Sequence, residues 1–316
     1  MNKAFISLAL LALTLLSGCG GGTSDTAQTP TASDIPQTEI TPRTENTAFT
    51  STHFSGSQNC ATCHNGIKDV ANKDVSIESD WAGTMMANSS KDPLWQAKVA
   101  SELKRNPHLE DVINDKCTKC HAPMANYEAH HIQETPKLFD DGFLNPQNQH
   151  FDAAMNGVSC SLCHQIDATN LGTLDGFSGH YTINQNREIY GQYTGVNTTP
   201  MLNNVNYTPM YAQHISESKM CASCHNLKTP FVDANGNLLT TTLESEFPEQ
   251  MPYSEWEHSE FASTNAKSCQ ECHMQRADGV VISNRPNNGL AIRDNFKRHN
   301  FVGANILMLD ILNQNK

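Results

Sequence analysis

Five copies of the sequence Cys-x-x-Cys-His occur in this chain, and together they contain ten of its eleven cysteines. Each copy presents two thiols and an imidazole within five residues, which is the spacing typical of covalent c-type haem attachment. The two thiols bond to one porphyrin, and the histidine becomes the proximal ligand of its iron. The predicted haem-binding cysteines are Cys60, Cys63, Cys117, Cys120, Cys160, Cys163, Cys221, Cys224, Cys269 and Cys272, and the predicted proximal histidines are His64, His121, His164, His225 and His273.

Other uses of paired cysteines fit this pattern less well. A single Cys-x-x-Cys is often a zinc knuckle or a thiol redox pair. Tetrahedral zinc would need the cysteine pairs two by two, and five is an odd number. Disulfides would not require a histidine after every second cysteine. The motifs therefore predict five covalently bound haem c groups.

The first residues have the pattern of an export signal. Lys3 is followed by an apolar stretch from Ala4 to Leu16, which is shorter than the roughly 20 residues that span a bilayer. The stretch ends in Leu-Ser-Gly-Cys19, which resembles the lipobox of bacterial lipoproteins. This resemblance implies a lipid anchor on Cys19, and Gly20 after it implies the outer membrane. An ordinary secretory peptide with an incidental cysteine is the alternative.

Composition divides the chain into three parts. Residues 1–18 are the predicted lipoprotein signal peptide. Residues 19–52 are rich in Gly, Thr, Ser, Pro and Gln, so they are expected to form a flexible linker to the lipid anchor. Residues 53–316 are the predicted pentahaem cytochrome c domain.

The expected fold class is mainly α with extensive loops, in which short helices pack around a chain of stacked haems. Hydrophobic residues make up 38% of the chain and aromatic residues 7%, so we expect the cofactors to supply much of the core. The motifs are unequally spaced, which argues against a strict solenoid.

Local patterns predict a few elements. Asp92 and Pro93 indicate the capped start of a helix that ends near Arg105. Further helices are expected from about 211 to 221 and over 304–312. Residues 165–210 are expected to be mostly loop with a short hairpin, and 228–250 to contain a turn at 233–237 between strands.

The ligand on the far side of each iron has to come from elsewhere in the chain. Electron-transfer haems usually have six ligands, and nine histidines lie outside the motifs. His53, His180, His214 and His299 are the preferred distal ligands, and the pair His130 and His131 should supply one at most. Met85 is a further candidate, because a helix would place it on one face with Trp81; filling space beside a haem is its alternative role. The remaining histidines are His108, His150 and His258, and the charged surroundings of His258 suggest that it is exposed.

The chain resembles the multihaem cytochrome c superfamily, the group that includes tetrahaem cytochromes c and hydroxylamine-oxidoreductase-like proteins. The resemblance implies electron transfer along closely stacked haems, with His180, His214 and His299 as distal ligands. Ammonia-forming nitrite reductases of this group have a lysine in place of one motif histidine, whereas all five motifs here end in histidine. The stretches that carry the resemblance are 81–86, 92–93, 117–124, 157–166, 221–230, 255–256 and 299–305.

We therefore expect an electron carrier rather than an enzyme. Its partners would be other redox proteins of the cell envelope, such as donor and acceptor cytochromes or a terminal reductase. A net charge of −12 makes nucleic acid an improbable partner and favours a basic surface on the redox partner.

Two alternatives stay open. In the first, the protein is a reductase or oxidase of a small nitrogen or sulfur compound, with one open haem near Arg187, His150 or His258. In the second, the protein is a subunit of a larger conductive assembly, in which neighbouring chains donate ligands to one another.

Overall fold

The computed structural model describes residues 45–239, 242–285 and 289–303. The predicted signal peptide, the lipid-anchor residue Cys19 and the helix expected over 304–312 lie outside these residues. None of the helices in the described ranges has the length and apolar character needed to cross a membrane.

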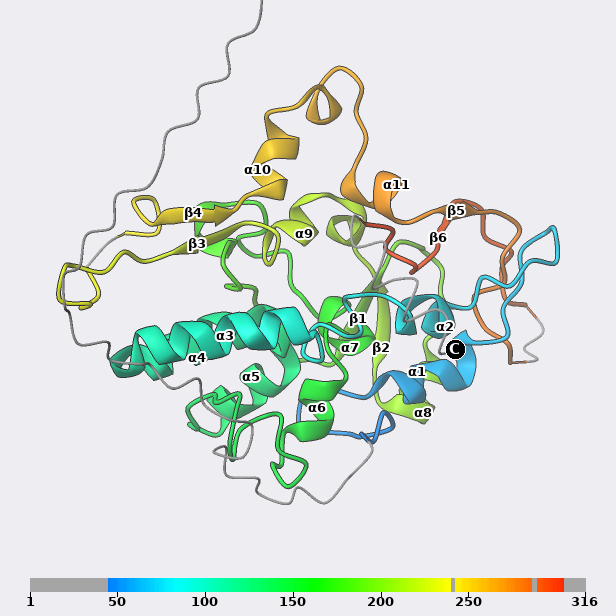
Figure 1. The fold of residues 1–316 in the computed structure, drawn as a ribbon. Coiled ribbons are helices and arrows are strands. Elements are labelled where there is room, and N and C mark those ends of the chain that lie inside the picture. Colours follow the sequence, from blue (N-terminus) through cyan, green and yellow to red (C-terminus); the bar gives the residue numbers. More distant parts are fainter. Residues whose placement is uncertain (1–44, 240–241, 286–288, 304–316) are drawn as a thin grey trace, which may run out of the picture. The chain divides into compact units, whose positions relative to one another are not determined.

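Many short helices joined by long loops, with three two-stranded sheets, form the described part of the chain (Figure 1). The expected fold is thus confirmed in its coarse form only, since strands accompany the helices. The α-helices are α1 (Ser57–His64), α2 (Ile77–Ala82), α3 (Pro93–Arg105), α4 (Glu110–His121), α5 (Pro123–His131), α6 (Phe151–Met155), α7 (Cys160–Cys163), α8 (Thr199–Val205), α9 (Lys219–Ala222), α10 (Pro252–Glu257) and α11 (Cys269–His273). The 3-10 helices are η1 (Pro107–Leu109), η2 (Leu174–Gly176), η3 (Gln213–Ser216) and η4 (Glu260–Ala262), and the strands are β1 (Glu188–Gly191), β2 (Thr208–Tyr211), β3 (Leu227–Thr229), β4 (Phe247–Gln250), β5 (Arg276–Ala277) and β6 (Phe296–Lys297).

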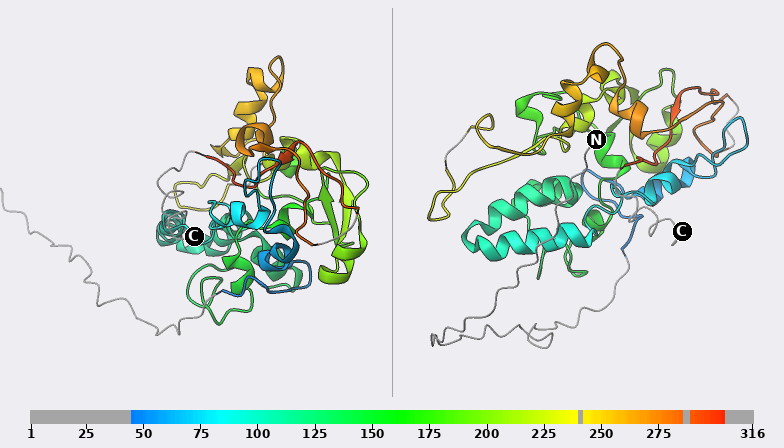
Figure 2. Two further views of the ribbon diagram at one scale, coloured as in Figure 1. Left: turned by 90° about the vertical axis from the view of Figure 1, so that its right-hand side faces the viewer. Right: turned by 45° about the horizontal axis from the view of Figure 1, so that its top comes forward.

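The longest helix, α3, begins where the sequence predicts. The Asp92 carboxylate accepts the Leu94 N–H at 2.9 Å, and Pro93 occupies the first helical position. Trp95 and Val99, four residues apart, form its buried face, whereas Leu94 is exposed. Helix α3 packs on α4, and α4 packs on α5, so the three lie together in Figures 1 and 2.

The main apolar core lies around α5, α6 and α7. Its fully buried members include Phe54, Met124, Leu138 and Leu162. A second, small cluster contains Ile67, Val75, Val280 and Phe296 and joins the loop after α1 to the segment between β5 and β6. These contacts hold the C-terminal part of the described chain against the region of the first motif.

Strands β1 and β2 correct two of the sequence-based expectations. They pair in parallel, with α8 in the connection, so they do not form the hairpin expected within 165–210, where antiparallel pairing is limited to the bridge between Ile166 and Ile183. The single helix expected over 211–221 is also wrong. Tyr211 pairs with Gly191 in this sheet, and only the short helices η3 and α9 follow, the second of which contains Cys221. Pairing with a distant strand has displaced the local helical preference.

The turn expected at 233–237 is confirmed. Val232 and Leu238 form an antiparallel bridge across it, and Gly236 has a positive φ of 83°. Strands β3 and β4 pair on the same arm, which extends past α3 and α4 in Figure 1. His108 lies within hydrogen-bonding distance of the Gly236 carbonyl, 2.6 Å from its Nε2, and so holds the tip of the arm.

The last residues of the predicted linker pack against the folded part. The Asn46 N–H donates to the Asp152 carboxylate at 2.9 Å, Lys91 pairs with Glu45 at 2.8 Å, and Phe49 is buried. The folded part therefore begins before His53.

The close packing of the segment that precedes the third motif predicts a strong effect at Gly157. Its φ is +59°, and an added Cβ would lie 2.6 Å from the carbonyl oxygens of Met86 and Ala87. Gly157→Ala should therefore lower the free energy of unfolding more than Gly66→Ala, whose φ is similar at +67° but whose surroundings are open. In urea unfolding, we expect Gly66→Ala to lower the free energy of unfolding by about 1–2 kcal/mol. Gly157→Ala should lower it by about 1–3 kcal/mol more than that. Equal losses would show that this close approach is not a constraint.

Candidate functional site

All five motifs lie on single helical turns. The first ends α1, the second ends α4, the third is α7 with His164 following it, the fourth spans α9 and the turn after it, and the fifth is α11. Cysteines three residues apart share one side of a helical turn, which presents both thiols in one direction. None of the ten motif cysteines forms a disulfide within the described part of the chain.

Four of the five motif imidazoles are held by a backbone carbonyl at Nδ1. The acceptor comes from a different part of the chain in each case. Since a carbonyl only accepts hydrogen bonds, Nδ1 carries the proton and Nε2 keeps the lone pair that binds a metal. The Nδ1–oxygen distances are 2.7 Å from His64 to Ile282, 3.3 Å from His121 to Ser89, 2.6 Å from His164 to Tyr190 and 2.6 Å from His273 to Val302.

The fourth motif histidine, His225, is held differently. Its backbone carbonyl accepts the N–H of Tyr253 at 3.1 Å. Burial by surrounding protein lowers its pKa, although the residue has exposed surface.

Cysteines of different motifs contact one another. Thiols of the first and third motifs, the second and fourth, and the fourth and fifth are close neighbours. These pairs are Cys60 with Cys160, Cys120 with Cys224, and Cys221 with Cys269. The main chain adds a link, because the Cys269 N–H donates to the Ser218 hydroxyl at 3.0 Å.

The third and fourth motifs are also neighbours. Cys163 lies near both Cys221 and Cys224. Tyr181 is partly buried beside Cys224, Cys120 and Cys163, and its hydroxyl donates to the Lys119 carbonyl at 3.0 Å. The fourth motif is thus the place where the second, third and fifth motifs meet.

The histidine of the second motif has an aromatic neighbour that the sequence did not identify as part of the site. The Trp95 indole stacks on the His121 imidazole, with ring centres 4.5 Å apart and an interplanar angle of 6°. The Ser89 hydroxyl also donates to the His121 carbonyl at 2.8 Å. The position of Trp95 on the buried face of α3 was its only sequence signal, and such a position also suits an ordinary core residue.

His299 is the predicted distal ligand with the most unusual surroundings. Burial, together with the nearby His164 and His64, lowers its pKa to about 3. Its Nδ1 is buried without a well-formed hydrogen bond in the described part of the chain, and the Lys297 backbone lies beside the ring. The centres of the His299 and His164 rings are 6.2 Å apart, with an interplanar angle of 28°. Its ring is therefore neutral and open to a further partner.

His53 is buried and held by Glu128. The ring nitrogen Nδ1 of His53 lies 3.2 Å from one carboxylate oxygen of Glu128, and the backbone N–H of His53 donates to the other at 2.8 Å. Burial raises the pKa of Glu128, but hydrogen bonds from Ser51 and His53 outweigh this effect and lower it. The ring of His53 also meets that of His131 edge-on at 4.4 Å. A carboxylate that orients a histidine is common behind metal ligands.

His180 and His214 lie in different settings. His180 is partly buried beside an open cleft that Lys116 and Lys119 also line, and this burial lowers its pKa. His214 is buried, with its Nε2 already 2.9 Å from the Ile166 carbonyl. As a distal ligand, His214 would therefore have to use Nδ1.

The other candidates lie in surroundings that differ from those expected. Helix α2 ends at Ala82, so the expected helix face shared by Trp81 and Met85 is wrong. The Trp81 indole instead donates to the Val158 carbonyl at 2.9 Å. The rings of four other histidines lie within hydrogen-bonding distance of non-motif groups: His108 of Gly236, His130 of Asp115, His150 of Glu134 and His258 of Ser254.

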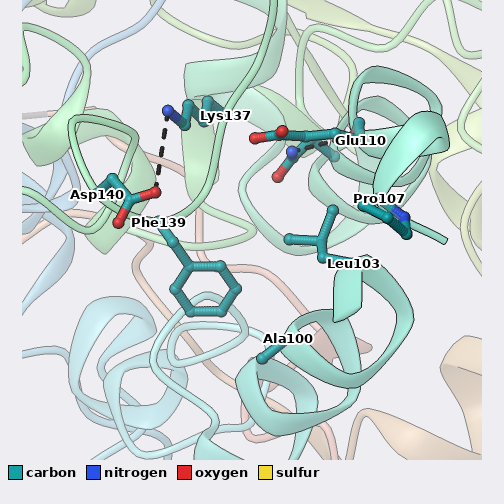
Figure 3. Close-up of a pocket in the computed structure, with 8 residues that line it drawn as sticks. Ala100, Leu103, Pro107, Glu110, Lys137, Phe139 and Asp140 are labelled. Atoms are coloured by element: carbon teal, nitrogen blue, oxygen red, sulfur yellow. Dashed lines mark hydrogen bonds and ion pairs between the residues drawn. The ribbon is translucent and has the colours of Figure 1, made fainter. Parts of the chain in front are cut away.

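A surface cleft beside α3 and α4 is separate from the motifs. Leu103, Phe139 and Ala100 form its apolar wall, with Lys137 on the opposite side (Figure 3). Lys137 is paired with Asp141 at 2.8 Å, and no motif residue lines the cleft. Within the described ranges, no group of three or more His, Cys, Asp or Glu side chains is arranged to hold a metal ion by itself.

No protein-family model, curated protein or solved structure matches this chain.

The stack on His121 predicts a graded effect at Trp95. Trp95→Ala should lower the free energy of unfolding by about 3–5 kcal/mol, since it removes a large buried side chain. Trp95→Phe should lose clearly less, because a flat ring still stacks on the imidazole, an interaction worth about 0.5–1.5 kcal/mol. Urea unfolding followed by circular dichroism would measure both. If Phe and Ala at this position destabilise equally, the stack contributes nothing.

Proposed function

We propose that this chain is a pentahaem c-type cytochrome that transfers electrons between redox partners in the cell envelope. The observation that carries the proposal is the common arrangement of the motif histidines. Four of them hold Nδ1 against a backbone carbonyl and leave Nε2 for an iron. The motif cysteines would attach five haems, each of which supplies one-electron redox chemistry when bound.

The surroundings of His299 fit such a group. A buried imidazole without a proper hydrogen bond is costly unless a further partner satisfies it. A metal–imidazole bond is about 2 Å long and the ring centre lies roughly 1 Å beyond the bonded nitrogen, so two imidazoles on opposite sides of one metal have centres about 6 Å apart. The separation of 6.2 Å between His164 and His299 matches this value. These two histidines would be the axial pair of the third haem.

The contacts between motifs indicate the order of electron transfer. Cysteines of the first motif lie near those of the third, those of the third near the fourth, and those of the fourth near both the second and the fifth. The proposed path therefore runs from the first haem through the third to the fourth and divides there. A divided path would give the protein more than two places for electron exchange.

Among the five motifs, the fifth is the best placed for contact with a redox partner. Cys272 and His273 are exposed, whereas Cys120 and Cys163 are only partly accessible. The net charge of −12 favours a partner with a basic surface, and the encounter would weaken as salt is added. The sequence of the first 20 residues supports a lipid-anchored location at the outer membrane.

The ferric spectrum tests the proposed role as a carrier. If histidines close all five irons, the oxidised protein should show only low-spin haem in low-temperature electron paramagnetic resonance. It should also bind neither cyanide nor nitrite at any haem. A high-spin component that binds these ligands would instead support the alternative function, a reductase with one open haem.

Removal of the His299 ring should affect a single haem. His299→Ala is expected to convert about one fifth of the ferric signal from low-spin to high-spin, because one of five irons loses its distal ligand. The control is His108→Ala, since the His108 ring already lies within hydrogen-bonding distance of Gly236. In the same ferric spectrum, His108→Ala should keep all haems low-spin, whereas His299→Ala should show the high-spin component. An unchanged spectrum of His299→Ala would contradict its assignment as a ligand.

A further inference from the structure

A buried ion pair joins two segments that lie 218 residues apart. The Arg298 guanidinium donates to Asp80 through Nε at 2.8 Å and through Nη2 at 2.6 Å. Both side chains are only 13% exposed. Such a two-point pair fixes the direction of both side chains as well as their distance.

Arg298 directly precedes His299, so the ion pair determines where the histidine lies. The main chain on both sides is also held. The Arg298 N–H donates to the Gln275 carbonyl at 2.8 Å, and the Val302 N–H donates to the His273 carbonyl at 3.0 Å. These bonds connect the segment to the fifth motif, but they do not reach the first or the third.

The conformation around His299 is not one that the segment would adopt without support. Phe301 has a positive φ of 37°, which is unfavourable for a residue with a side chain. Asn300 Oδ1 is buried without a hydrogen bond among the described residues. Contacts elsewhere must compensate for these costs, and the ion pair is the strongest polar contact from this segment to the region of the other motifs.

Asp80 belongs to the region that carries the first and third motifs. Helix α2 packs on α1, which contains Cys60 and His64. The next residue, Trp81, donates to the Val158 carbonyl just before the third motif. The position of Asp80 is therefore fixed relative to His64 and His164.

We propose that Asp80 and Arg298 are positioning residues that hold His299 opposite His164 as a distal haem ligand. This inference rests on the proposed function. Neither residue touches the haem in this account. They act through His299, by tying the segment after the fifth motif to the helix that supports the first and third.

The test uses the full-length, haem-loaded protein and measures spin state. Asp80→Asn removes the charge, and Arg298→Lys keeps the charge but loses the two-point contact. Either variant should make one of the five haems partly high-spin and raise the affinity of that iron for added cyanide about tenfold or more. Added imidazole should restore the low-spin signal. Arg298→Lys is the milder change, so it can be used for the same spin-state measurement if Asp80→Asn does not fold.

A nearby exposed ion pair provides the matched control. Arg276 binds Asp278 at 2.9 and 3.0 Å, but their side chains are 60% and 41% exposed. Asp278→Asn should leave all five haems low-spin with unchanged cyanide binding. In addition, the double variant Asp80→Asn, His299→Ala should have the same spectrum as His299→Ala alone.

The outcomes separate the inference from the proposed function. If Asp80→Asn and Arg298→Lys lower only the thermal stability and keep five low-spin haems, the pair is merely structural and the inference is overturned. If His299→Ala changes no haem, the ligand assignment fails first. If the wild-type protein contains no covalent haem, the proposed function itself fails.

Discussion

The hydrogen bond between a motif imidazole and a distant backbone carbonyl is the constraint on which much of this structure depends. A neutral imidazole with its proton on Nδ1 keeps the Nε2 lone pair available for iron, and a hydrogen bond from Nδ1 fixes both this tautomer and the orientation of the ring. The four carbonyls that meet this need come from Ser89, Tyr190, Ile282 and Val302. The loops of this fold are therefore not mere connections, since each must bring one carbonyl to one ring.

The segment from β5 to Val302 combines several of these tasks. Ile282 supplies the acceptor for the first motif, Val302 supplies it for the fifth, and His299 lies beside the histidine of the third. The small apolar cluster around Val280 and Phe296 and the ion pair of Arg298 with Asp80 hold this segment in place. One stretch of chain thus connects three motifs that are far apart in sequence. In the proposed account, that connection is what brings the haems within electron-transfer contact.

The sequence predicted the features that depend on neighbouring residues. The motifs, the cap of α3 at Asp92 and the turn near Gly236 all follow from local chemistry. The features that it did not predict depend on distant partners. Tyr211 joins a sheet with Gly191 instead of a helix, Trp95 stacks on a histidine 26 positions later, and Arg298 finds Asp80 across 218 residues. No local pattern distinguishes these residues from ordinary strand, core or surface positions, so the order of the motifs in space could not be derived from sequence either.

The central claim is that the chain carries five covalently bound haems. The intact mass of the mature protein, combined with the pyridine haemochrome spectrum of the same sample, tests it most directly. Five bound haems should increase the mass by five haem groups even after denaturation, give a spectrum typical of thioether-linked haem, and leave no free motif thiols. A mature chain without bound haem, with motif cysteines that an alkylating reagent can modify, would contradict it.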